Sequence, residues 1–152
     1  MARSALLNVM VNAAHKAGRR LARDFGEVQN LQVSVKGPGD FVSAADLMSE
    51  KIIFEELSKA RPDTGFLMEE RGEVKGKDPQ NRWIVDPLDG TTNFLHGIPV
   101  FGISIALERE GEIVAGVVYN PAMDELFTAE KGRGAFLNDR RIRVAARKEM
   151  TD

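Results

Sequence analysis

The chain has 152 residues, 43% of them hydrophobic and 29% charged, which is usual for a soluble globular protein with a single-domain core. Its net charge of -2 gives no general attraction to nucleic acid, so we expect no direct nucleic-acid partner. The absence of cysteine excludes disulfides, thiolate nucleophiles and cysteine-bound metals.

The first predicted element is a helix with one apolar face. Apolar residues recur at steps of three and four, and Gly26 suits the position just past the helix end. The same stretch is interrupted by polar residues, so we expect no membrane span and interpret the chain as cytoplasmic. The apolar face consists of Leu6, Met10, Ala13, Ala17, Leu21 and Phe25.

A short strand and a second helix are predicted next. The letters QVSV alternate in polarity and are followed by a break at Gly-Pro-Gly, residues 37–39. Ser43 suits an N-cap, Asp46 would then lie in the first turn, and Pro62 would stop the helix at about residue 60. A carboxylate in a first turn is sufficiently explained by the helix dipole.

The remainder of the chain predicts short strands on short connections, and therefore a mostly antiparallel sheet. We expect turns at Glu110-Gly111 and after Asn120, and chain breaks at the glycines 132 and 134. The polar stretch 71–81 predicts an exposed loop. The strand-like runs read GFLM, RWIV, VFGISIALERE, IVAGVVYN, ELFTAEK and RIRV.

The stretch WIVDPLDGTTNF, residues 83–94, carries the strongest chemical signal. Proline after Asp86 favours a β-turn, which would bring Asp86 and Asp89 within about 7 Å of each other. Two such carboxylates repel unless a cation lies between them, and Mg²⁺ prefers oxygen ligands, to which the Leu88 carbonyl could add. Gly90 allows a close approach, and Thr91 could begin a helix whose N–H groups face an anion.

The alternative is a plain surface turn, because short acidic turns are common. The context favours a ligand-binding site. The DPLD turn follows the apolar run WIV, and the apolar run FLM is likewise followed by two acidic residues, Glu69 and Glu70. Strand ends that carry carboxylates are typical ligand sites of α/β proteins. His15, His96, Lys36 and Asp40 carry weaker signals, each without an evident partner.

DPLDGTTNF after WIV, with an upstream EE pair and DFVSAAD, resembles the inositol monophosphatase family and most closely its bacterial SuhB-type members. The resemblance covers essentially the whole chain. It implies an α+β fold in which two helices pack on a mostly antiparallel sheet, the first half of a layered αβαβα sugar-phosphatase fold.

The resemblance also implies roles. Glu69, Asp86, the Leu88 carbonyl and Asp89 would bind Mg²⁺, with Asp86 bridging two ions, and Asp89 would also face the sugar hydroxyls. Gly90 and Thr91 would offer N–H groups to the substrate phosphate. Thr91 and Asp46 would orient the attacking water, assisted by Glu69.

The family pattern predicts Mg²⁺-dependent, lithium-sensitive hydrolysis of a phosphate monoester such as inositol 1-phosphate, by a cytoplasmic homodimer. Residues 1–152 would form a single domain, the N-terminal half of such an enzyme. On this resemblance the C-terminal half would be absent, because the only tryptophan, Trp83, precedes Ile84 and not the aspartate of the family's later Trp-Asp motif. Met68 and Arg71 also depart from the pattern beside the EE pair.

Two alternatives stay open. Within the same chemistry, the chain could belong to a fructose 1,6-bisphosphatase or a nucleotide 3'-phosphatase, because the acidic turn is shared. In a different class, it could be a non-catalytic module that binds a cation or a protein partner, since some bacterial relatives are thought to act alongside the transcription machinery.

Overall fold

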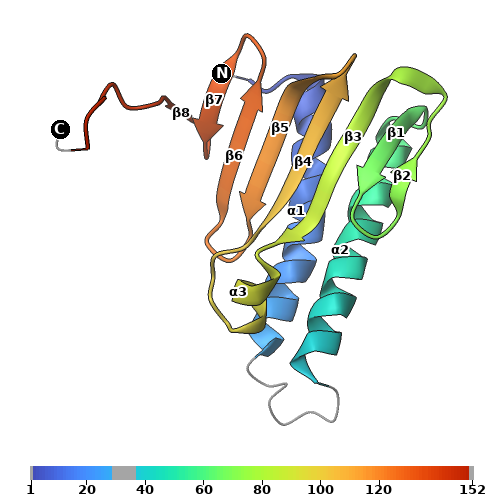
Figure 1. Ribbon diagram of the computed structural model, residues 1–152, viewed down its shortest axis with the longest axis vertical. Coiled ribbons are helices and arrows are strands. Elements are labelled where there is room, and N and C mark those ends of the chain that lie inside the picture. The colour runs from blue at the N-terminus through green and yellow to red at the C-terminus, as the bar shows by residue number, and fades with distance from the viewer. Residues whose placement is uncertain (1, 29–36, 151–152) are drawn as a thin grey trace.

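The computed structural model describes residues 2–28 and 37–150. Two long helices lie side by side on one face of an eight-stranded sheet, and a short third helix follows β3 (Figure 1). The α+β class is therefore confirmed. The elements are α1 (Ala5–Glu27), α2 (Pro38–Ala60), β1 (Thr64–Met68), β2 (Gly72–Val74), β3 (Asp78–Asp89), α3 (Thr91–Leu95), β4 (Gly102–Arg109), β5 (Glu112–Asn120), β6 (Glu125–Glu130), β7 (Gly134–Leu137) and β8 (Arg140–Ile142).

Helix α1 confirms the predicted apolar face. Residues from Leu6 to Leu21 on this face are buried, and the Ser4 hydroxyl caps the helix by accepting the N–H of Leu7 at 3.1 Å. The predicted end was early, because Gly26 lies inside the helix, which continues to Glu27. Among the described residues, no helix is long and apolar enough to cross a membrane.

Helix α2 begins earlier than the sequence pattern predicted. Its N-cap is Gly37 and its first residue is Pro38, so Ser43 is not the cap. Proline suits a first helical position because its fixed φ is helical and its missing N–H would have no partner there. Asp46 consequently lies in the third turn, too far from the helix N-terminus for a dipole role. The predicted strand in QVSV falls outside the described residues.

The sheet is mostly antiparallel, as predicted, with the order β2-β1-β3-β4-β5-β6-β7-β8. Its exception is the parallel pair β1 and β3. The prediction of a loop at 71–81 was wrong, because this polar stretch forms β2 and the start of β3. β2 is an edge strand, where polar residues can pair without being buried. The sequence-based prediction also missed β7, because Gly134 was interpreted as a chain break and not as the first residue of a strand.

The hairpin between β4 and β5 turns where the sequence predicted. Glu110 and Gly111 both have positive φ, 52° and 80°, as the favoured two-residue hairpin turns require. β5 then ends at Asn120, the predicted boundary.

The core lies between the two long helices and the sheet. Gly18 of α1 packs closely on β5, because a Cβ at this position would lie 2.5 Å from the ring of Tyr119. A cluster of aromatic rings, Phe25, Phe94 and Phe101, joins α1 to α3 and to the segment before β4. This cluster fixes α3 against the end of the helical layer.

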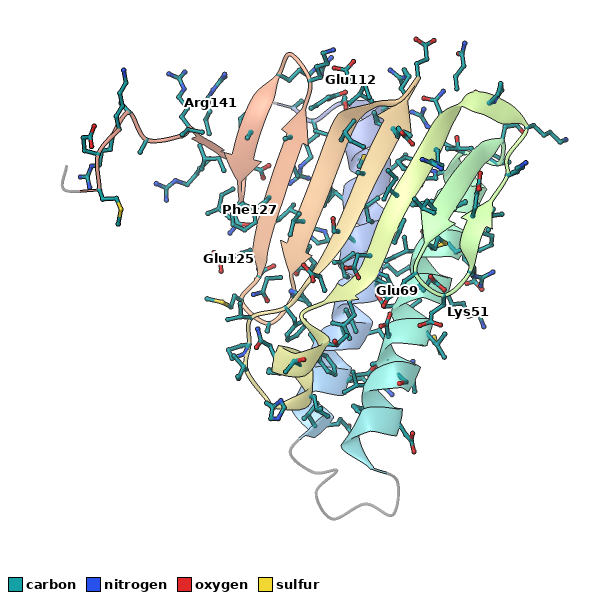
Figure 2. The ribbon with its side chains drawn as sticks, in the orientation of Figure 1. Lys51, Glu69, Glu112, Glu125, Phe127 and Arg141 are labelled. Atoms are coloured by element: carbon teal, nitrogen blue, oxygen red, sulfur yellow. The ribbon has the colours of Figure 1, made fainter. Side chains whose placement is uncertain are left out.

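The opposite face of the sheet carries an apolar patch over β4, β5 and β6. Cross-strand neighbours Ala106, Gly116 and Ala129 share it with the pair Val118 and Phe127. Val118 and Phe127 are 48% and 37% exposed, and both line a groove of about 240 Å³. Figure 2 labels Phe127 on β6. Both long helices lie on the other side of the sheet (Figure 1).

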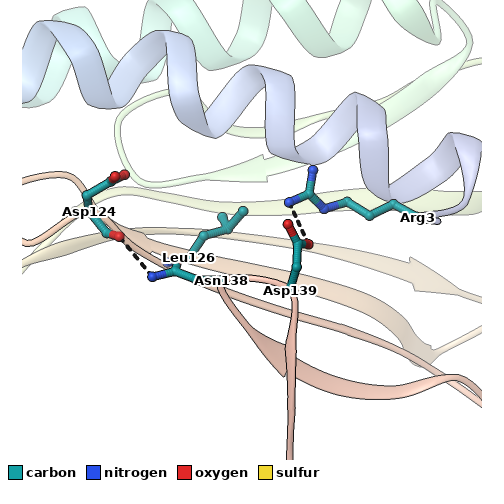
Figure 3. Close-up of polar contacts among 5 residues, drawn as sticks. All are labelled: Arg3, Asp124, Leu126, Asn138 and Asp139. Carbon is teal, nitrogen blue, oxygen red and sulfur yellow. Dashed lines mark hydrogen bonds and ion pairs between the residues drawn. The ribbon is translucent and has the colours of Figure 1, made fainter. Parts of the chain in front are cut away.

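The turn after β7 is held from two directions (Figure 3). Asn138, at φ 46°, donates from its amide to the Asp124 carbonyl at 3.2 Å and accepts the N–H of Leu126 at 2.8 Å. The neighbouring Asp139 receives a 2.9 Å ion pair from Arg3, which precedes α1. The end of the sheet is thereby joined to the beginning of the chain.

Candidate functional site

The predicted site residues come from three neighbouring segments. Asp46 lies on α2, Glu69 follows β1, and the DPLDGT stretch closes β3 and opens α3. Figure 2 shows Glu69 where the sheet meets helix α2. The site is therefore at one end of the sheet, beside the helical layer.

The parallel pairing of β1 with β3 explains why the acidic ends meet. Met68 of β1 pairs with Val85 of β3, and Glu69 and Asp86 directly follow these two paired residues along the chain. The carboxyl ends of parallel strands lie at the same edge of a sheet. Carboxylates 17 positions apart in the chain are thus brought to one edge by a single strand pairing.

Helix α2 adds a buried carboxylate to this edge. Oxygen atoms of Asp46, Glu69 and Glu70 lie within 4.8 Å of one another. Asp46 is buried, whereas both glutamates are exposed. The Oδ1 atom of Asp46 is buried and has no hydrogen-bond partner in the described part of the chain. Such a cluster could hold a metal ion, because hard cations take several carboxylate oxygens.

The electrostatics of the site disfavour negative charge. Burial, followed by repulsion from Glu69 and Asp86, raises the pKa of Asp46 to about 7. Burial and then Asp86 raise the pKa of Glu69. Burial also raises the pKa of Asp86, and Asp89 adds to the rise. A cation at this position would relieve the repulsion that all three groups share.

The DPLD segment is not the predicted β-turn. It is the end of β3, where Asp86 pairs with Ser104 and Asp89 with Gly102, so β3 carries one extra residue in a bulge. The N–H of Leu88 donates to the Asp86 carboxylate at 3.2 Å. Asp89 is exposed beside a pocket of about 390 Å³. Within this segment Leu88 is buried, Asp86 is half-buried and Asp89 is exposed.

The predicted short helix is present. Gly90 has a φ of 89°, and a Cβ there would lie 3.0 Å from the Val100 carbonyl, so the position favours glycine. Thr91 begins α3 and is exposed. The first N–H groups of a helix have no intrahelical partner. In the described residues, no hydrogen bond links Thr91 to Asp46, so their predicted pairing remains a prediction.

The predicted set of site residues lacked Glu70, which belongs to the cluster, and two residues beside the cluster, Glu50 and Ser49. Glu50 is 2% exposed, and its Oε1 accepts the N–H of Glu70 at 3.0 Å. Ser49 is fully buried and donates to the Pro87 carbonyl at 2.7 Å. The signal for Glu50 was its position four residues after Asp46, which places both on one helix face.

The minor candidates lie elsewhere. His15 packs edge-on against Tyr119, with ring centroids 4.8 Å apart. The Nδ1 of His96 lies 2.8 Å from the Thr92 carbonyl. Asp40 is exposed in the first turn of α2, and Lys36 is outside the described residues.

Comparison with known proteins adds sequence and structural relatives. The profile of the "Inositol monophosphatase family" matches residues 2–152. An inositol-1-monophosphatase of Mesorhizobium japonicum is 76% identical over 152 residues, 100% of this chain and 57% of the relative. A Nus factor SuhB of Pasteurella multocida is 43% identical over 95% of this chain and 54% of its own length.

Solved structures share the fold. The crystal structure of the extragenic suppressor protein suhB from Bartonella henselae matches with a TM-score of 0.88 and 64% identity. The match covers 98% of this chain and 58% of that protein. The chain thus spans between one half and two thirds of the length of these relatives.

Proposed function

Because the chain belongs to the inositol monophosphatase family, we propose that it provides the metal- and phosphate-binding part of a Mg²⁺-dependent phosphatase acting on inositol 1-phosphate. The observation that carries the proposal is the buried carboxylate of Asp46: its Oδ1 has no hydrogen-bond partner among the described residues, and one of its oxygens lies within 4.8 Å of carboxylate oxygens of Glu69 and Glu70. Buried polar atoms are normally satisfied, so an orphaned carboxylate oxygen is consistent with a ligand that completes it.

The donor set fits a hard cation. Every side chain in the cluster offers oxygen, and Mg²⁺ prefers oxygen ligands. In this proposal Glu69, Asp86, Asp89 and the Leu88 carbonyl hold the ions. When bound, Mg²⁺ would neutralise phosphate oxygens and lower the pKa of the attacking water.

The chain's own groups would act on both substrate and water. The N–H groups of Gly90 and Thr91 are proposed to bind the phosphate, supported by the exposed helix start that follows the positive φ of Gly90. Asp46 and Thr91 are proposed to orient the attacking water. Asp89, exposed beside its pocket, is proposed to face the sugar hydroxyls.

We propose further that residues 1–152 form one domain, the N-terminal half of a layered αβαβα enzyme. Support comes from the apolar face of the sheet opposite α1 and α2, where Val118 and Phe127 are exposed. A sheet that is apolar on both faces is typically covered on both. Assembly as a homodimer, lithium sensitivity and a cytoplasmic location remain predictions of the family resemblance.

A second candidate function is a non-catalytic module that binds a cation or a protein partner. The observation that favours it is the set of relatives named Nus factor SuhB, which reach 46% identity over 95% of this chain. Asp89→Asn separates the two functions in the full-length protein: loss of phosphatase activity with retained partner binding would assign them to different residues.

The experiment that tests the main proposal is phosphate release from inositol 1-phosphate by the 152-residue chain, with Mg²⁺ alone and with added Li⁺. Asp86→Asn should abolish the release, while Asp63→Asn, an exposed aspartate before β1, should leave it unchanged. Fructose 1,6-bisphosphate and a nucleoside 3'-phosphate test the rival substrates. A folded chain that releases no phosphate from any of them would contradict catalysis by this chain alone.

A further inference from the structure

Glu50 is a buried carboxylate to which the proposed reaction gives no role. It lies on α2, one turn after Asp46, and is 2% exposed. Its Oε1 accepts the backbone N–H of Glu70 at 3.0 Å, and its Oε2 lies 3.9 Å from Nε of Arg71. One side chain of the helical layer therefore contacts two consecutive residues of the turn between β1 and β2.

Arg71 is held by the next turn of the same helix. Its guanidinium carbon lies 4.1 Å from the ring centroid of Phe54, four residues after Glu50. Asp46, Glu50 and Phe54 follow one another at steps of four, so they share one face of α2. This face meets the turn three times: at the glutamate carboxylates, at the N–H of Glu70 and at the Arg71 side chain.

The sheet alone does not fix this turn. The strand pairing of β1 with β2 ends at Met68 and Gly72, so residues 69–71 lie beyond the ladder. Glu69 and Glu70 are exposed, and their carboxylates repel Asp46. This repulsion favours movement of the short turn away from α2, and it is opposed by the contact of Arg71 with Phe54 and by Glu50, which makes the one bond to the N–H of Glu70 in the described part of the chain.

We propose that Glu50 is a positioning residue: by accepting the N–H of Glu70, with Arg71 as its counter-ion, it holds the carboxylates of Glu69 and Glu70 beside Asp46. The inference rests on the proposed metal-dependent function and adds a residue outside the ligand set. A carboxylate placed here adds to the negative charge of the cluster, which is unfavourable for stability. The hydrogen bond that it accepts from Glu70 and its contact with Arg71 offset this cost.

Two substitutions separate the hydrogen bond from the charge. Glu50→Gln and Glu50→Ala remove the same charge, but only glutamine keeps an oxygen that can accept the N–H of Glu70. Mn²⁺ affinity of the 152-residue chain, measured by calorimetry with the metal alone, should be at least tenfold tighter in Glu50→Gln than in Glu50→Ala. Glu55→Ala, an exposed glutamate on the same helix, should match the parent chain. Equal affinities of the Gln and Ala variants would overturn the proposal.

Crystal structures of the metal-free Gln and Ala variants provide a readout that does not depend on metal binding. We expect Glu69 and Glu70 to keep their distance from Asp46 in Glu50→Gln and to move away in Glu50→Ala. If the parent chain binds no Mn²⁺, the proposed metal-dependent function is contradicted. The metal-free structures would still test whether Glu50 positions the turn. An unmoved turn in Glu50→Ala would contradict it.

If Glu50→Ala does not fold, Arg71→Met takes its place, because the Arg71 side chain is 42% exposed and tolerates exchange. Removing a positive charge near the cluster would tighten Mn²⁺ binding if charge alone mattered. The positioning role predicts weaker binding, since Glu50 loses its counter-ion and the turn loses its contact with Phe54. Tighter binding would overturn the proposal.

Discussion

The hydroxyl of Ser49 donates a 2.7 Å hydrogen bond to the carbonyl oxygen of Pro87, 38 positions later in the chain. Ser49 is fully buried on α2, and Pro87 lies in the bulge of β3 between the two aspartates of DPLD. The adjacent Glu50 holds the turn after β1. Two consecutive residues of one helix therefore contact both acidic segments of the site.

Ser49→Ala should destabilise the fold, because it leaves the Pro87 carbonyl buried without its partner. The expected loss in the free energy of unfolding is about 1–3 kcal/mol. Urea unfolding measures it. The matched control is Ser43→Ala, an exposed serine on the same helix, which should change stability by less than about 0.5 kcal/mol. An equal loss in both variants would contradict the assignment of the effect to the hydrogen bond between Ser49 and Pro87.

The metal-free chain should lose stability as the pH rises from about 4 to about 7. The pKa of Asp46 is about 7 in the folded chain against 3.8 for the unperturbed group, so between these values the folded state binds a proton that the unfolded state has released. The raised pKa of Glu69 acts in the same direction. Urea midpoints at pH 5 and pH 8 in EDTA measure the loss. Asp46→Asn should reduce the difference between them, and an unchanged difference would contradict the raised pKa.

Adding Mg²⁺ should reverse part of this loss at pH 8. A cation that binds only the folded state stabilises it by about 2.7 kcal/mol at one hundred times its dissociation constant. The melting temperature of the parent chain should rise with Mg²⁺ concentration, whereas that of Asp86→Asn, which lacks one of the proposed ligands, should rise much less. Equal increases in both would place the bound ion elsewhere.

Gly18→Ala should destabilise α1 against the sheet. The added Cβ would stand 2.5 Å from the Tyr119 ring, and overpacking of a core costs about 1–3 kcal/mol. Gly26→Ala is the control, because nothing lies within 4 Å of a Cβ there and alanine favours a helix by up to about 1 kcal/mol. Thermal unfolding should therefore give shifts of opposite sign, and two stabilising shifts would contradict the close contact.

Asn138→Ala should weaken the turn after β7. It removes two side-chain hydrogen bonds and places alanine at a φ of 46°, where a side chain costs about 1–2 kcal/mol. Asn138→Gly removes the same bonds but tolerates the backbone angle. Urea unfolding should find Asn138→Gly the more stable of the two variants. The reverse order would show that the backbone angle carries no strain.

Periodicity predicted much of the fold. The apolar face from Leu6 to Leu21, the antiparallel strands and the turn at Glu110-Gly111 all follow from patterns within a few residues. The failures lay where local signals conflict. The Gly-Pro-Gly sequence suggested a break in the chain, whereas Pro38 begins α2. The polar stretch 71–81 shows no alternation of polar and apolar residues, yet it forms β2 and the start of β3.

By itself, the sequence determined which chemistry the chain can offer: carboxylates follow two apolar runs, Gly90 directly follows the second acidic segment, and no cysteine is available. Only the tertiary structure decided how these groups meet. The parallel pairing of β1 with β3 aligned Glu69 with Asp86, and the early start of α2 placed Asp46 and Glu50 over them. Such contacts join residues about twenty to forty positions apart, so no pattern along the chain encodes them, and they form only when helix and sheet pack together.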